Sequence, residues 1–92
     1  MKSAARASRE EAESLAIQAL TFIAEEPERL SRFLDMTGIP IGQIRDAARE
    51  RGFLAGVLEH MLTDENLLIA FASQSGIDPA DVARAHGALD RR

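Results

Sequence analysis

The sequence predicts an all-α fold, a compact bundle of five to six short helices within one domain. Apolar residues recur at steps of three and four residues, which places them on one face of a helix. Clear two-residue alternation and Asn-Gly or Asp-Gly hairpin turns, the usual signals of strands, do not occur. Glycines and prolines stand between the periodic segments, where they end and begin helices. A chain of 92 residues fits a single domain of this kind.

The first predicted helix runs from about Ser8 to Ala24. Its apolar residues share one face, and they are Ala12, Leu15, Ala16, Ala19, Leu20 and Ile23. The second helix begins near Pro27, because a proline lacks only an N–H group that the first turn leaves unbonded. It ends at Gly38, since glycine adopts the left-handed conformation that ends helices. Its expected buried residues are Leu30, Phe33 and Leu34.

A short third helix is predicted to begin at Pro40 and to end at Gly52. It carries Ile41, Ile44, Ala47 and Ala48. The fourth helix has two adjacent apolar stripes made of Phe53, Leu54, Val57, Leu58, Met61 and Leu62. Gly56 lies inside it and costs about 1 kcal/mol relative to alanine. We therefore expect another helix to cross the fourth helix closely at Gly56.

Either Thr63 or Asp64 is the expected N-cap of the fifth helix, because its side-chain oxygen can accept a first-turn N–H. That helix ends at Gly76. The sixth begins with Asp78 as N-cap followed by Pro79, and its apolar residues are Val82, Ala85 and Leu89. We expect residues 1–8 to form a flexible tail, residues 9–89 the single helical domain, and residues 90–92 a second tail.

A shift of 38 residues aligns the two halves of the sequence weakly. Gly38 falls on Gly76, and the other identical or similar pairs include Ile39 with Ile77 and Phe33 with Phe71. One interpretation is an internal duplication into two similar three-helix halves. The other is that helices of equal length end with the same chemistry.

Composition argues against several classes of function. The chain has no cysteine, which excludes disulfides, thiolate metal sites and cysteine nucleophiles, and its net charge of −4 disfavours nucleic acid as a partner. No apolar run is long enough to span a membrane. His60 and His86 have no metal-ligand spacing around them, and we expect His60 to lie on the surface. No cofactor, small-molecule substrate or catalytic residue is indicated, so the chain is predicted not to be an enzyme.

A second hypothesis is a DNA-binding regulator with a helix-turn-helix-like unit. Ala72, Gly76 and Val82 have the spacing of such a corner, with Ile77 as the apolar residue after the turn. Leu34, Gly38 and Ile44 match this spacing less well at an earlier corner, which is the alternative. The side chains that would contact DNA are Arg45, Arg49 and Arg51 after the earlier corner and Arg84 after the later one. Two carboxylates at the start of the sixth helix would face phosphates, and this favours a packed corner over a DNA reader.

The preferred hypothesis is a small non-catalytic domain that binds a protein partner or a second copy of itself. The fifth helix is apolar all round over Leu67 to Ala72, so it either lies centrally or leaves part of its surface for a partner. The candidate interface consists of Leu54, Leu58, Met61, Leu67, Leu68, Ile69 and Phe71.

Three stretches resemble a family of short bacterial proteins classed as a domain of unknown function. They are LAIQALTFIAEEPERLSRFLDMTG, FLAGVLEHMLTDENLLIAFASQSGIDP and ADVARA, and together they cover most of the chain from Leu15 to Ala85. The resemblance implies a small, all-helical, cytoplasmic domain. It implies no activity and no catalytic residues.

Overall fold

The computed structural model describes residues 3–50 and 52–90, and over these residues the chain is all-helical with no strand. This confirms the predicted fold class. The elements are α1 (Ser3–Ala24), α2 (Pro27–Thr37), the 3-10 turn η1 (Ile41–Gln43), α3 (Ile44–Ala47), α4 (Phe53–Leu62), α5 (Glu65–Ser75) and α6 (Pro79–Asp90).

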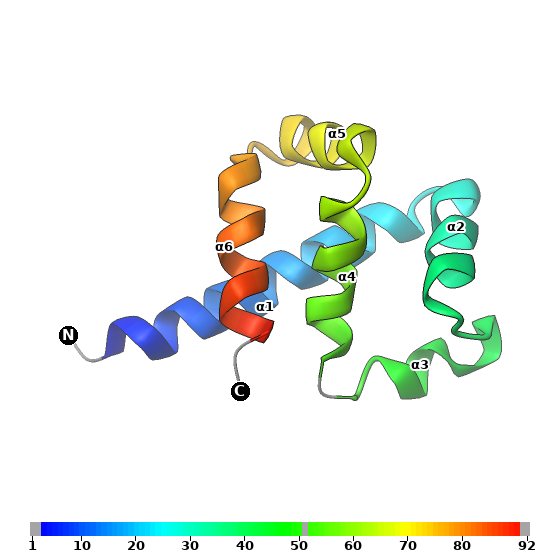
Figure 1. Cartoon of the computed structure of the whole chain (residues 1–92), viewed down its shortest axis with the longest axis horizontal. Coiled ribbons are helices and arrows are strands. Elements are labelled where there is room, and N and C mark those ends of the chain that lie inside the picture. Colours follow the sequence, from blue (N-terminus) through cyan, green and yellow to red (C-terminus); the bar gives the residue numbers. More distant parts are fainter. Residues whose placement is uncertain (1–2, 51, 91–92) are drawn as a thin grey trace.

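The long helix α1 organises the other helices. In Figure 1, α4 and α6 stand side by side and both cross α1, which runs behind them. Helix α5 lies across the upper ends of α4 and α6, and α2 and α3 form the right-hand side of the molecule. Helix α1 makes its most extensive contacts with α6 and α4, and a smaller one with α2.

Alanines make this arrangement compact. Ala12, Ala16 and Ala19 lie on the buried face of α1, and Ala16 and Ala19 have no exposed surface. The distance between packed helices depends on the side chains at their contact, so a face of methyl groups allows close approach. The facing helices contribute Val57 and Val82 to the same core.

Aromatic pairs attach the outer helices to this centre. The ring of Phe71 on α5 lies 5.4 Å from the ring of Phe22 on α1. The ring of Phe33 on α2 makes an edge-to-face contact with Phe53 on α4 at 6.2 Å. Both distances fall in the range of favourable aromatic pairs.

The helix ends confirm most of the predicted caps. Gly38 and Gly76 have positive φ angles of 75° and 69° and end α2 and α5. Of the two candidate caps for α5, Asp64 accepts the Leu67 N–H at 3.2 Å. Asp78 accepts the Ala80 N–H at 2.9 Å before α6.

Two predicted boundaries are wrong. Helix α1 begins at Ser3 rather than near Ser8. The single helix expected from Pro40 to Gly52 is a 3-10 turn followed by the four-residue α3, and Gly52, at φ 87°, precedes α4 as its N-cap. Only Ile44 and Ala47 of α3 are partly buried against the core, and a short helix without a packed face is not self-sustaining.

The two halves of the sequence are alike at their glycine turns but differ in their helices. Gly38 and Gly76 cap corresponding helices in the same left-handed conformation. Their third helices differ, because α3 has four residues and α6 has twelve. Since α1 packs against both α4 and α6, the halves do not form separate units.

The prediction that another helix crosses α4 closely at Gly56 is wrong. A Cβ atom placed on Gly56 would meet no atom of a neighbouring element within 4 Å, and its φ is not positive. We predict that Gly56→Ala stabilises the fold by about 1 kcal/mol because alanine loses less backbone entropy in a helix. The melting temperature should rise by about 4–8 °C. Gly76→Ala is the contrasting control and should lower it; a fall for Gly56→Ala would contradict the open environment.

The alanine face of α1 leads to the opposite prediction for a larger side chain. Ala16→Leu should cost about 1–3 kcal/mol of unfolding free energy, because the added methylenes must separate packed helices. The same change at the exposed Ala83 of α6 is the matched control and should stay within about 0.5 kcal/mol. Urea denaturation of the two variants measures the difference. Equal stabilities would show that α1 is not closely packed at Ala16.

Candidate functional site

The surface predicted on the fourth and fifth helices is largely interior. Leu58, Met61 and Phe71 have no exposed surface, and Leu67 is also buried. Leu54 and Leu68 are half-buried, which leaves Ile69 as the one clearly exposed member of the predicted set. The prediction is wrong for the buried residues because α4 turns Leu58 and Met61 onto the core and α5 turns Leu67 and Phe71 onto it.

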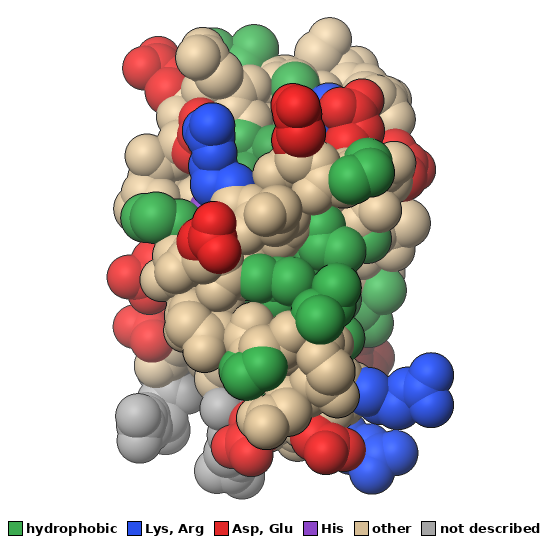
Figure 2. All heavy atoms as spheres, turned by 90° about the vertical axis from the view of Figure 1, so that its right-hand side faces the viewer, with side chains coloured by type: hydrophobic (Ala, Val, Ile, Leu, Met, Phe, Trp, Pro, Cys, Tyr) green, Lys and Arg blue, Asp and Glu red, His purple; other side chains and the backbone are tan. Residues whose placement is uncertain are grey.

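An apolar groove lies instead between α2 and the segment that follows it. Its volume is about 450 Å³. The apolar lining consists of Pro27, Leu30, Leu34, Ile39, Pro40 and Ile41. Ser31 and Asp35 complete the wall. In Figure 2, which shows the face carrying α2 and α3, hydrophobic side chains gather toward the centre of the surface.

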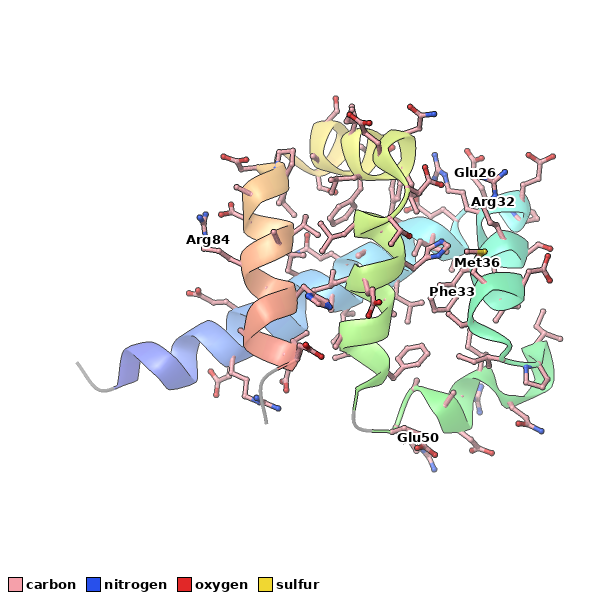
Figure 3. The ribbon with its side chains drawn as sticks, in the orientation of Figure 1. Glu26, Arg32, Phe33, Met36, Glu50 and Arg84 are labelled. Atoms are coloured by element: carbon pink, nitrogen blue, oxygen red, sulfur yellow. The ribbon has the colours of Figure 1, made fainter. Side chains whose placement is uncertain are left out.

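The orientation of α2 produces the groove. Phe33 points from α2 toward α4 and anchors the inner side of the helix (Figure 3). Leu30 and Leu34 are four residues apart and therefore adjacent on the helix surface, and both remain half-buried. The left-handed turn at Gly38 then sends Ile39 and the following residues along the groove side of α2.

Ile41 is an exposed member of the groove lining, with 69% of its surface in water. Its neighbours in the groove are also apolar, so its exposure extends a continuous apolar surface. Met36 is as exposed as Ile41, and Ile17 and Ile69 are about half exposed, but none of the three lines the groove. Singly exposed aliphatic residues are common on proteins, whereas a hollow lined with them is a feature of binding sites.

The acidic residues of α2 lie on the groove side of the helix. Asp35 lines the groove directly. Glu28 precedes it by seven residues, about two helical turns, and so lies on the same side of α2. Neither residue takes part in an ion pair within the described part of the chain. This edge of the groove is therefore negative.

The two arginines of α2 are engaged elsewhere. The Arg29 guanidinium lies 4.0 Å from the centre of the Phe22 ring and donates a hydrogen bond to the Phe22 carbonyl at 3.3 Å. Arg32 lies 3.6 Å from the Asp64 carboxylate, next to α5. These contacts tie α2 to the end of α1 and to the N-cap of α5, and neither guanidinium forms an ion pair with Asp35.

His60 is buried rather than on the surface as expected, with 7% of its area exposed. Its ring packs edge-on against Phe33 at 5.2 Å. Burial lowers its pKa from the usual 6.5; the Asp64 carboxylate opposes this shift and the Arg32 guanidinium adds to it. The sequence does not distinguish His60 from a surface histidine, because only the fold brings Phe33 beside it.

His86 is the second histidine and lies on α6. Its Nε2 atom is 3.8 Å from a carboxylate oxygen of Glu59 on α4. That nitrogen is buried and has no hydrogen-bond partner among the described residues. No group of three or more potential metal ligands occurs in the described part of the chain.

The arginines predicted to contact DNA do not gather on one surface. Arg45 lies in α3 and Arg49 just after it, both exposed. Arg84 points outward from α6 on the opposite side of the molecule and pairs with Asp81 of its own helix (Figure 3). Arg51 lies outside the described residues.

The predicted helix-turn-helix corner is a packed one. Ala72 and Val82 are buried, and Ile77 is half-buried between them. The Asp78 carboxylate, at the start of α6, lies where a DNA reader would approach phosphates. No observation here favours the DNA hypothesis, which stays a prediction.

The sequence does not predict the groove, because the periodicity places Leu30 and Leu34 in the core and Ile41 in a helix. The available signal is the segment GIPIG (residues 38–42), which places two isoleucines around a proline between two glycines. So short a turn cannot bury both isoleucines. The structure accordingly leaves Ile39 half-buried and Ile41 exposed.

Comparison with known proteins gives one family match. The model of a family described as "Protein of unknown function (DUF3572)" matches residues 9–92. No curated protein and no solved structure matches the chain. Within the described residues, no helix is both long and apolar enough to cross a membrane.

The lowered pKa of His60 predicts a pH-dependent stability. Well above pH 6.5 the imidazole is neutral in both the folded and the unfolded chain. As the pH falls below 6.5 the unfolded chain binds the proton more readily, so the folded state loses stability. Urea midpoints should therefore fall between pH 7.5 and pH 5.5, about one unit either side of the usual histidine pKa.

His60→Leu removes the titrating group, and its urea midpoint should fall less over the same pH range. His86→Gln is the comparison variant, and its urea midpoint should still fall between pH 7.5 and pH 5.5 because His60 remains in place. Equal pH dependence in the unsubstituted chain and in His60→Leu would show that burial of His60 does not govern the effect.

Proposed function

The chain belongs to the DUF3572 family of unknown function, and we propose that it is a small non-catalytic domain that binds another protein through the groove beside α2. The observation that carries the proposal is the open apolar lining, which ends in the exposed Ile41. Removing apolar surface from water contributes about 25 cal/mol per Å². A partner that covers this groove would therefore gain binding free energy without any rearrangement of the core.

The chemistry of the lining supports binding rather than catalysis. Its polar groups are the Ser31 hydroxyl and the Asp35 carboxylate, and neither histidine of the chain contributes to it. General acid–base or nucleophilic chemistry needs a group of suitable pKa beside a nucleophile. The groove offers a concave apolar surface with one charged edge, which suits binding of a protein segment that has apolar side chains beside charged ones.

The proposal moves the binding surface without changing the expected class of function. Recognition is shifted from α4 and α5, which supply most of the interior, to α2 and residues 39–41. A cytoplasmic partner, as the family resemblance implies, is part of the proposal. Self-association through the groove is the competing form of the same function.

Site-specific photocrosslinking in intact cells of the source organism tests the proposed surface. A benzophenone amino acid replaces Ile41 in one variant and Ile69 in a second, since both side chains are exposed and lie on different elements. We expect one discrete crosslinked protein from position 41 and none of that mass from position 69.

A further substitution ties the crosslink to the groove. Leu34→Ser in the Ile41-labelled chain should weaken the crosslink, because Leu34 lines the same hollow. Circular dichroism establishes that this variant is folded. Equal crosslinking from positions 41 and 69, or no crosslink from position 41, would contradict the proposal.

A further inference from the structure

We infer that the groove binds an amphipathic α-helix from another protein, one with an aliphatic face and lysine or arginine along one flank. This inference rests on the proposed function and specifies the partner of the same groove. It is carried by the shape of the hollow, the aliphatic chemistry of its lining and the separation of charges on α2.

The architecture favours a helical ligand over an extended one. Strand addition needs an exposed sheet edge, and the described residues contain no strand. Recognition of a polyproline segment uses a groove lined by aromatic rings, whereas this lining contains no aromatic residue. An amphipathic helix instead lays an apolar face into a hydrophobic groove, which is what the side of α2 presents.

The aliphatic lining specifies the face of that helix. Leu30 and Leu34 form one wall, and Ile39 and Ile41 come from the segment opposite. Branched aliphatic side chains spaced three and four residues apart on the ligand would pack between these walls. Ile41 is mostly in water in the free domain, so covering it contributes to the affinity.

The charge of the groove edge specifies the flank of the helix. Asp35 lines the hollow and Glu28 lies two turns away on the same side, and no described residue pairs with either. Arg29 contacts the Phe22 ring and Arg32 pairs with Asp64, and neither guanidinium forms an ion pair with Asp35 or Glu28. A basic flank would complement the two carboxylates, and an acidic flank would be repelled.

Two designed peptides of about 14 residues test the inference. Both have the same leucine face, and all the remaining positions are lysine in one peptide and glutamate in the other. Backbone amide shifts of the ¹⁵N-labelled domain report where each peptide binds and how tightly. We expect the leucine/lysine peptide to shift residues of α2 and residues 39–41. We expect the leucine/glutamate peptide to bind about tenfold more weakly or not at all.

Charge reversal at the groove edge is the decisive variant. Asp35→Lys should weaken binding of the leucine/lysine peptide about fivefold to tenfold and improve binding of the leucine/glutamate peptide. Glu11→Lys is the matched control, since it makes the same change in net charge at an exposed residue of α1. It should leave both affinities nearly unchanged. Ile41→Ser should weaken both peptides, whereas Ile69→Ser should weaken neither.

Four outcomes would overturn the inference, and the last of them leaves the proposed function standing. The first is equal binding of the two peptides, and the second is shifts spread over α1 and α6 rather than α2. The third is a concentration-dependent dimer, seen by sedimentation, whose amide shifts map to the groove, because a second copy would then be the occupant. If position 41 crosslinks a protein in cells but neither peptide binds, the partner class is wrong and the proposed function survives.

Discussion

The close approach of α4 and α6 to the alanine face of α1 is the constraint on which the rest of the structure depends. Ala12, Ala16 and Ala19 leave room for helices that bring Val57 and Val82 into one core. The alanines leave few large side chains where α4 and α6 cross α1, so large side chains from the outer helices fill the rest of the core. Phe71 closes it beneath α5, and Phe33 closes it from α2. The outer helices are therefore fixed by one or two large side chains each.

The groove is a consequence of how α2 is attached. Phe33 packs toward α4, while Arg29 reaches back over the Phe22 ring and bonds the carbonyl near the end of α1. Both attachments use the inner side of α2. Its outer side keeps Leu30 and Leu34 only half covered, and the turn after Gly38 supplies the second wall. A helix bound by one side to a small core presents its other side to a partner.

The interior also holds a titratable group that contributes no charge to the groove. His60 packs against Phe33 and is close enough to the Arg32–Asp64 pair for both charges to act on its pKa. Its neutral form fits this environment, because burial disfavours the imidazolium more than the nearby carboxylate favours it. The contact joins α2 to α4 beside the groove, so the packing of His60 bears directly on the helix that forms the binding wall.

Local chemistry determined the helical class, the order of the helices and most of their ends, because apolar periodicity, glycine stops and aspartate caps act within a few residues. The family resemblance noted in the sequence agrees with the match over residues 9–92. Only the tertiary structure decided which apolar residues stay exposed to solvent instead of packing in the core. The sequence pattern places the exposed apolar surface on the helix richest in apolar residues, yet Leu67 and Phe71 of that helix face inward, and the apolar groove lies beside α2, where Ile41 is exposed. Burial depends on which faces meet across the fold, and periodicity along one helix carries no information about the helix that covers it.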